Sequence, residues 1–204
     1  GDLSGKSGTL LPLFKLEGMA TKWVLIVGLG KREKFSLSTL KKGVTAATNW
    51  AKAQKLSSAT FAMVSQCKKR ENSFPALMQA VGASLYQYDA YKSEKSPEVS
   101  LNSVNFYTES SDELTPLFNY GKALIEGMDF TRNLGNAPAN KMTPTILAEE
   151  AEALAAEESS IKCTILKKSE IEALGMGSFL GVAQGSVEEP RFIVLEYSNH
   201  SNSD

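Results

Sequence analysis

Residues that commonly carry catalysis or cross-links are scarce in this sequence. Its 204 residues include one histidine, His200, and two cysteines, Cys67 and Cys163. Two thiols so far apart make neither a disulfide framework nor a metal cluster, and they indicate free, reduced thiols in a cytosolic protein. A single histidine without a cysteine or second histidine nearby lacks the partner that orients a metal ligand or general base. His200 is therefore interpreted as a tail or loop residue.

Long apolar runs and a strong charge of either sign are also missing. No run approaches the roughly 18 residues that a membrane span needs, and no signal peptide is visible. We therefore expect no membrane partner and a cytoplasmic location. Lysine and arginine number 22 against 23 aspartates and glutamates, a net charge of −1. Because these charges form no basic face, nucleic acid is not indicated as a partner.

The first part of the chain alternates short apolar runs with helical spacing. Strands are predicted at residues 9–14, 23–27, 60–64 and 101–108. One helix is predicted from an N-cap at Ser38 to about Leu56, and a second starts near Ser73 and Pro75. Their apolar faces comprise Leu40, Val44, Ala47 and Ala51 in the first helix, and Leu77, Val81, Leu85 and Tyr88 in the second. Strands separated by such helices predict an α/β layered domain.

The second part of the chain predicts a connector followed by a new α/β segment. A helical pattern over residues 112–134 is a candidate connector between domains, and residues 133–140 (NLGNAPAN) are rich in turn formers. Thr143 and Pro144 then predict the start of a helix that runs to about Glu158, with Leu147, Ala151 and Leu154 on one face. Strands are predicted at residues 161–166 and 191–197. Between them, a capping box of Ser169 and Glu172 opens a short helix that ends at Gly175.

A glycine pair and four carboxylates are the first candidates for a functional site. Gly28 and Gly30 follow a strand, as in a dinucleotide-binding turn, but the third glycine and the helix start are missing, which favours a plain turn. The pairs Glu149–Glu150 and Glu157–Glu158 lie on a predicted helix, where adjacent residues point in different directions. They indicate a solvated face rather than a shared acid/base site.

Negative charge at a helix start and the two cysteines complete the candidates. Asp112 and Glu113 lie where the helix dipole favours negative charge. Cys163 alternates with Ile161 and Ile165, which indicates a small apolar residue of the core. Cys67 precedes a basic run, residues 68–70, that could lower its pKa, but no histidine lies near it in sequence. The residues by themselves therefore predict an α/β protein without an identifiable active site.

Two longer segments resemble a known family. Residues 131–144 (TRNLGNAPANKMTP) resemble the start of the catalytic domain of the leucyl aminopeptidases, the M17 metalloexopeptidases. Residues 174–197 (LGMGSFLGVAQGSVEEPRFIVLEY) resemble a later run of the same domain, with Glu189 where the family often has proline. The shorter segments 3–6 (LSGK), 27–31 (VGLGK) and 88–92 (YDAYK) follow in the family's order.

The resemblance implies a macro-like N-terminal α/β domain with a mixed sheet flanked by helices, a linker helix, and the beginning of an α/β metallo-exopeptidase domain. The expected bounds are residues 1–111, 112–136 and 137–204. It also implies a metalloaminopeptidase that acts on peptides, prefers N-terminal leucine, uses two divalent ions (Mn or Zn) and forms a hexamer. The family's metal and catalytic segments, Lys-Gly-x-x-x-Asp-Ser-Gly-Gly and Asn-Thr-Asp-Ala-Glu-Gly-Arg, do not occur in this sequence.

No catalytic, cofactor-binding or metal-binding residue is therefore assigned to this chain. We expect the ligands after Asp204 in a longer protein, and the chain alone to be inactive. Gly175, Gly177, Gly181 and Gly185 are expected to permit tight turns and close backbone approach. An alternative that remains open is a macro-like module that binds ADP-ribose or a related nucleotide and has no peptidase activity.

Overall fold

The computed structural model describes residues 4–62, 73–108 and 111–198. Cys67, the basic run at residues 68–70 and His200 lie outside these ranges. The chain divides into two compact units, Gly1–Thr131 and Arg132–Asp204, and this division falls inside one long helix. The domain bounds expected from the sequence stay a prediction, and each unit is described by itself.

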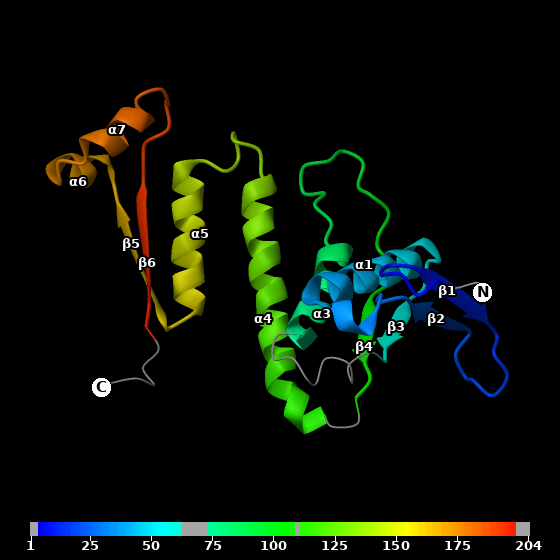
Figure 1. Ribbon diagram of the computed structural model, residues 1–204. Helices are drawn as coiled ribbons and strands as arrows, with labels where there is room; N and C mark the ends of the chain where they lie inside the picture. Colours follow the sequence, from blue (N-terminus) through cyan, green and yellow to red (C-terminus); the bar gives the residue numbers. More distant parts are fainter. Residues whose placement is uncertain (1–3, 63–72, 109–110, 199–204) are drawn as a thin grey trace. The chain divides into compact units, whose positions relative to one another are not determined.

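Two pairs of strands form the sheets of the first unit (Figure 1). Strands β1 (Leu10–Phe14) and β2 (Trp23–Val27) pair antiparallel, with Leu10 opposite Val27 and Phe14 opposite Trp23. Strands β3 (Ser58–Phe61) and β4 (Ser103–Phe106) pair in parallel. The predicted mixed α/β class is confirmed, although the described residues do not join the two pairs into one sheet. The predicted end of the third strand, residues 63 and 64, lies outside the described residues.

Helices surround these strands, and their apolar periodicity explains which faces they bury. They are the 3-10 helix η1 (Arg32–Lys34) and the α-helices α1 (Leu37–Ala53), α3 (Ser73–Leu85) and α4 (Ser111–Asn136). The predicted N-cap of α1 was wrong by two residues, because Ser36 rather than Ser38 occupies it. The amide of Thr39 donates to Ser36 Oγ at 3.3 Å, and the Thr39 hydroxyl accepts from the amide of Ser36 at 2.9 Å.

The core of the first unit lies between α1, α3 and the strands. Leu40, Val44 and Leu77 are fully buried, as the helical spacing predicted. The ring of Phe106 on β4 lies 5.3 Å from that of Phe74 on α3, edge to face. Burial of several large apolar side chains, each of which contributes about 1.5–3 kcal/mol, stabilises this arrangement.

Glycine allows α3 and α4 to approach each other closely. A Cβ atom added at Gly82 would lie 2.8 Å from Cγ2 of Ile125, and one at Gly121 would lie 2.5 Å from Sδ of Met78. Both distances are shorter than a normal van der Waals contact. A side chain at Gly82 would therefore press on the branched side chain of Ile125, whereas one at Gly121 would displace the flexible side chain of Met78. None of the described helices has the length and apolar character needed to cross a bilayer.

Helix α4 ends two residues beyond the helical pattern of residues 112–134. It continues to Asn136, the last residue of the expected linker helix, so that the first four residues of the predicted turn, 133–136, are helical. The turn itself begins at Ala137, whose amide donates to the carbonyl of Asn133 at 3.2 Å, and Lys141 donates to Pro138 at 2.8 Å. Pro116 is the sixth residue of the helix, beyond the first four amides that have no partner in any helix, so it removes one backbone hydrogen bond of the second turn.

The second unit is built on one antiparallel strand pair. Its elements are α5 (Pro144–Glu157), β5 (Ile161–Leu166), α6 (Lys168–Ala173), α7 (Gly177–Ala183) and β6 (Phe192–Tyr197) (Figure 1). In the pair β5–β6, Ile161 lies opposite Tyr197 and Leu166 opposite Phe192. Thr143 caps α5 as predicted, since its side chain accepts from the amide of Ile146 at 3.3 Å. Helix α7 was not predicted.

The start of α6 differs from the sequence prediction, and its end agrees with it. Glu170, not Glu172, accepts from the backbone of the N-cap residue, because the amide of Lys167 donates to Glu170 Oε2 at 2.8 Å. At the other end, Gly175 adopts φ 68° and donates to the carbonyl of Glu172, while Met176 donates to the carbonyl of Ile171. This pair of bonds is the Schellman motif, which requires a left-handed residue where the helix stops.

Candidate functional site

The glycine pair after β2 is held by backbone hydrogen bonds to the segment before β1, so its amides are not open to a ligand. The amide of Gly28 donates to the carbonyl of Thr9 at 2.8 Å, and the amide of Gly30 donates to the carbonyl of Gly5 at 2.9 Å. A Cβ atom at Gly28 would collide with the carbonyl of Lys6 and with the hydroxyl of Thr9. Phosphate-binding loops present free amides at the start of a helix. Here both amides are occupied and the short helix η1 follows, so the structure favours the plain turn.

The carboxylate pairs on α5 do not converge on a site. Glu149, Glu157 and Glu158 are exposed, and Glu150 is half-buried, while Ala148 and Ala151 form the buried face of the helix. Leu147 was wrongly assigned to that face, because 40% of it is exposed.

Acidic residues also begin α4, at a different place in the chain. Asp112 and Glu113 lie in its first turn, as the sequence predicted. Their charges suit the positive end of the helix dipole, which gives them a structural role.

Cys163 is the one cysteine among the residues that the structure describes. It is half-buried on β5, opposite Leu195 of β6. Burial raises the pKa of its thiol, and the negative charge of Glu152 raises this pKa further. A thiol that holds its proton in this way is a poor nucleophile, in agreement with the predicted role as a small apolar residue.

The glycines of the second unit were only partly explained by the sequence. Gly175 has the left-handed conformation that a tight turn needs. A Cβ atom at Gly177, Gly181 or Gly185 would meet open space within 4 Å in this chain. The expectation of close backbone approach at these three positions was therefore wrong, and two of them lie within α7.

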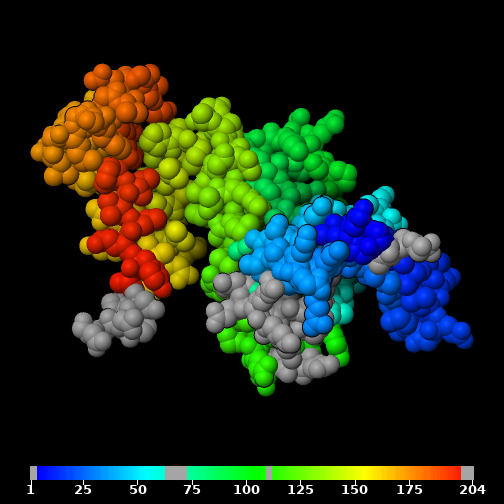
Figure 2. Space-filling model, viewed as in Figure 1, coloured from blue at the N-terminus to red at the C-terminus, as the bar shows by residue number. Residues whose placement is uncertain are grey.

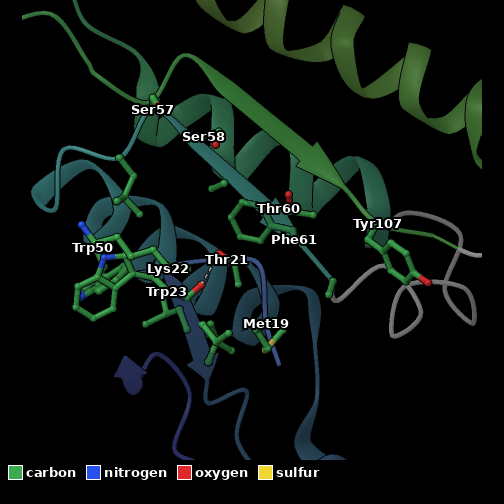
Figure 3. A pocket seen from close by; sticks show the side chains of 17 residues that line it. Met19, Thr21, Lys22, Trp23, Trp50, Ser57, Ser58, Thr60, Phe61 and Tyr107 are labelled. Carbon is green, nitrogen blue, oxygen red and sulfur yellow. Dashed lines mark hydrogen bonds between the residues drawn. The ribbon is translucent and has the colours of Figure 1, made fainter. Parts of the chain in front are cut away.

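A cavity of about 740 Å³ lies in the first unit, between β2 and β3. Figure 3 shows Trp23 and Trp50 at one end of it and Tyr107 at the other. The two indole rings meet edge to face, 5.3 Å apart. Its lining, all of it described by the structure, contains neither a carboxylate nor a histidine or cysteine, and Lys22 is its one charged residue. Such a lining offers shape and apolar contact, but no carboxylate, imidazole or thiol that could act as a general base or bind a metal ion.

Sequence reasoning did not single out this cavity. It depends on how strands far apart in the chain face each other, and no local motif marks that. Trp23 and Trp50, which line it, belong to a predicted strand and a predicted helix, and nothing in the sequence around them predicts that they line a cavity. Among the described residues, moreover, no three histidine, cysteine, aspartate or glutamate side chains come together in a way that could hold a metal ion.

Two family models match the chain. One, described as "Cytosol aminopeptidase family, N-terminal domain", matches residues 1–95. The other, described as "Cytosol aminopeptidase family, catalytic domain", matches residues 129–204. The second match covers both segments on which the resemblance to leucyl aminopeptidases was based.

Similar structures agree with this assignment. A tomato leucine aminopeptidase mutant superposes with a TM-score of 0.82 at 27% identity, and the match covers 99% of this chain and 40% of that one. The bottromycin maturation enzyme BotP, in complex with Mn, gives a TM-score of 0.78 at 22% identity over 96% of this chain and 40% of its own. At that identity, the likeness to BotP shows the fold alone.

Curated relatives match along the whole chain. A protein of Paraburkholderia phymatum is 38% identical over 205 residues, 97% of this chain and 40% of the relative. One of Pseudomonas fluorescens is 35% identical over 209 residues, 100% of this chain and 42% of the relative. Both are named "Probable cytosol aminopeptidase", and this chain spans about two fifths of their length. Through these matches and the two family models, the chain belongs to the cytosol aminopeptidase family.

Proposed function

We propose that this chain is the N-terminal portion of a metal-dependent leucyl aminopeptidase, which releases N-terminal amino acids, preferably leucine, from peptides. The observation that carries the proposal is the presence of both family domains, in order, on one chain. Relatives 34–38% identical over nearly all of this chain support it. Peptides are accordingly the proposed substrates.

The proposed enzyme uses two divalent ions, either Mn or Zn. The described residues do not fit such a pair, because they bring no three potential ligands together, and a two-metal site needs several carboxylates in one pocket. We therefore place the ligands in sequence outside this chain and assign none of its residues to the metals. Mn is the first ion to test, because BotP is described in complex with it.

The activity is tested on a longer protein that contains this chain and the rest of the family's length. Purified protein, loaded with Mn or Zn, is expected to hydrolyse leucyl p-nitroanilide, and the metal-free form is expected to be inactive. If neither ion supports turnover of this substrate, the proposed activity is wrong. An alanyl and a glutamyl p-nitroanilide in parallel measure the preference for leucine.

We also propose that residues 1–204 alone bind no catalytic metal pair and hydrolyse no peptide. Calorimetric titration of the chain with Zn or Mn tests this directly, followed by the same assay of activity. Binding of two ions at micromolar affinity or better, together with turnover, would show that the active site lies within this chain.

The nucleotide-binding alternative gains no support. Its best candidate, the turn at Gly28 and Gly30, has both amides engaged by backbone carbonyls. The family match also continues into the catalytic domain rather than ending after the first unit.

The proposal further includes a cytoplasmic homo-hexamer, which rests on the family resemblance. Sedimentation of the longer protein tests the assembly, since a hexamer and a monomer differ sixfold in mass. A monomer at micromolar concentration would contradict the assembly without touching the proposed activity.

A further inference from the structure

The even balance of charge over the whole chain conceals an uneven distribution. Residues 4–62 contain ten lysines and arginines but two acidic residues, Glu17 and Glu33, which gives this segment a net charge of +8. An excess of this size creates a positive potential over part of the first unit, and that potential attracts acidic partners.

Three short segments gather four of these cations at one end of the first unit. The amide of Gly8 donates to the carbonyl of Gly28 at 2.9 Å, and Ser7 Oγ donates to the carbonyl of Thr39 at 3.3 Å. A Cβ atom at Gly8 would lie 3.1 Å from Cε of Lys42, so that this side chain crosses the turn. Figure 2 shows the residues of this turn, dark blue, beside those of α1, lighter blue. The exposed cations on these segments, which we call the basic surface, are Lys6, Lys31, Arg32 and Lys42.

Few carboxylates offset the charge of the basic surface. Glu33 follows Arg32 directly in the chain, and the first turn of α1 contains no acidic residue. None of the four cations takes part in an ion pair with another described residue. The expectation that the charges form no basic face was therefore wrong at this end of the unit.

Helix α5 carries the opposite charge in the second unit. The helix and its C-cap contain five glutamates, and no basic residue lies between Lys141 and Lys162. Glu157 and Glu158 end the helix, where the dipole disfavours negative charge and where the last turn contains no basic residue. Like charges this close on one helix also repel each other. A basic group from outside the helix would offset both costs.

We propose that the basic surface of one copy of the protein docks on the acidic helix α5 of a second copy. Charge complementarity carries the inference, because both surfaces belong to this chain and both carry charge that their own surroundings leave largely uncompensated. A contact between two unlike surfaces is head-to-tail, so it builds rings or chains of copies. The inference rests on the proposed homo-oligomer, and it does not depend on peptidase activity.

Nucleic acid fits these observations less well than a second copy. The aromatic residue nearest to the basic surface in sequence, Phe35, is half-buried, so it offers little area on which a base could stack. A nucleic acid would also leave the negative charge of α5 without a partner.

Charge reversal on the longer protein, followed by sedimentation, tests the contact. One variant combines Lys31→Glu with Arg32→Glu, and the other combines Glu149→Lys with Glu157→Lys. Each variant alone is expected to associate at least about tenfold more weakly than the unchanged protein, because like charges then face each other. An equimolar mixture of the two is expected to regain association, since each reversed surface then meets a complementary one. Recovery on mixing also shows that both variants are folded.

A matched control combines Lys95→Glu with Lys122→Glu, two exposed lysines of the first unit outside the basic surface. It changes the net charge as the first variant does, and it is expected to associate like the unchanged protein. An equal loss in this control would make net charge the cause and overturn the proposal.

The remaining outcomes separate this inference from the proposed assembly. Variants that associate as well as the unchanged protein overturn the docking and leave the homo-oligomer standing, whereas a longer protein that is a monomer at every concentration overturns both. Recovery that needs both pairs of changes on one chain, and not mixing, assigns the contact to a single copy and overturns the proposal. Unchanged association, with binding of double-stranded DNA lost in the first variant, would assign the basic surface to nucleic acid instead.

Discussion

The two units of the chain differ in how completely they bury their apolar residues. In the first unit, Leu40 and Leu77 have no exposed surface and belong to a contiguous core of helices and strands. In the second, the buried apolar residues that the structure describes are Ala148, Ala151 and Ile171. The first unit therefore has a core of its own, whereas the second depends more on local hydrogen bonds and strand pairing.

Large apolar side chains remain on the surface of the second unit. Leu195 and Tyr197 on β6 are 46% and 70% exposed, and Leu174 is 64% exposed. The atoms of β6, red in Figure 2, are visible at the surface. Exposed apolar side chains that lie close together, such as Leu195 and Tyr197 on β6, are typical of a surface that another part of a protein covers. In a protein as long as the relatives, we expect this surface to be covered.

The largest effect should come from the core of the first unit. Leu77→Ala is expected to lower its free energy of unfolding by about 2–5 kcal/mol, because it opens a cavity in a fully buried site. Leu195→Ala, the matched leucine of the second unit, should leave this transition unchanged. Both tryptophans, Trp23 and Trp50, lie in the first unit, so urea unfolding followed by their fluorescence reports on that unit alone. Equal shifts for the two variants would erase the proposed contrast.

Glycine packing between α3 and α4 sharpens the contrast further. Gly82→Ala is expected to destabilise the first unit by about 1–3 kcal/mol, because the new Cβ overlaps Ile125. Gly127→Ala on α4 meets open space, and its better helix propensity should stabilise by up to about 1 kcal/mol. Thermal unfolding of both variants should show shifts of opposite sign, and shifts of the same sign would argue against close packing at Gly82.

Turn chemistry should dominate over packing in the second unit. Gly175→Ala places a side chain at φ 68° and is expected to cost about 1–2 kcal/mol. Gly185→Ala, with open space and no positive φ, should have almost no effect. Amide exchange in α6 measures the difference. If both variants leave it unchanged, the Schellman turn does not limit the stability of this unit.

The smallest effect concerns the thiol of Cys163, whose pKa is raised by burial and by Glu152. The folded chain then holds this proton more tightly than the unfolded chain. The protonated thiol therefore contributes to the stability of the fold below the ordinary thiol pKa, and this contribution is lost as the pH rises from that value through the raised pKa of the folded chain. Alkylation in a Cys67→Ser background should be slower in the folded chain than in denaturant at the same pH. A folded thiol that reacts at the denatured rate would contradict the burial.

Local signals predicted most of the helices correctly. The face of α1 and the cap at Thr143 depend on spacing and on one side chain, which the sequence shows directly. The predicted cap at Ser38 was wrong because Ser36 is an equally good cap, and Ser36 is selected by its reciprocal bonds with Thr39. Helix α7 was missed because its glycines disfavour helix, while Phe179 is held against Phe192 of β6 at 5.5 Å.

Non-local pairing explains what the sequence could not predict about the candidate site. The cavity lies between β2 and β3, two strands that are 30 residues apart in the chain. Nothing in the sequence around Leu25 or Thr60 indicates that these strands lie on opposite sides of a cavity. The family, in contrast, could be recognised from residues 131–144 and 174–197, because many residue types at fixed positions are more specific than any single side chain.

The turn at Gly28 also determines which substitutions this protein can tolerate. Any side chain there would meet backbone atoms of the segment around Lys6, which cannot rotate away as a flexible side chain can. In a library that samples every amino acid at every position, Gly28 should therefore be nearly invariant among folded variants. Gly127 and Gly135, which face open space, should drift freely, so that the glycines of one chain would diverge at very different rates.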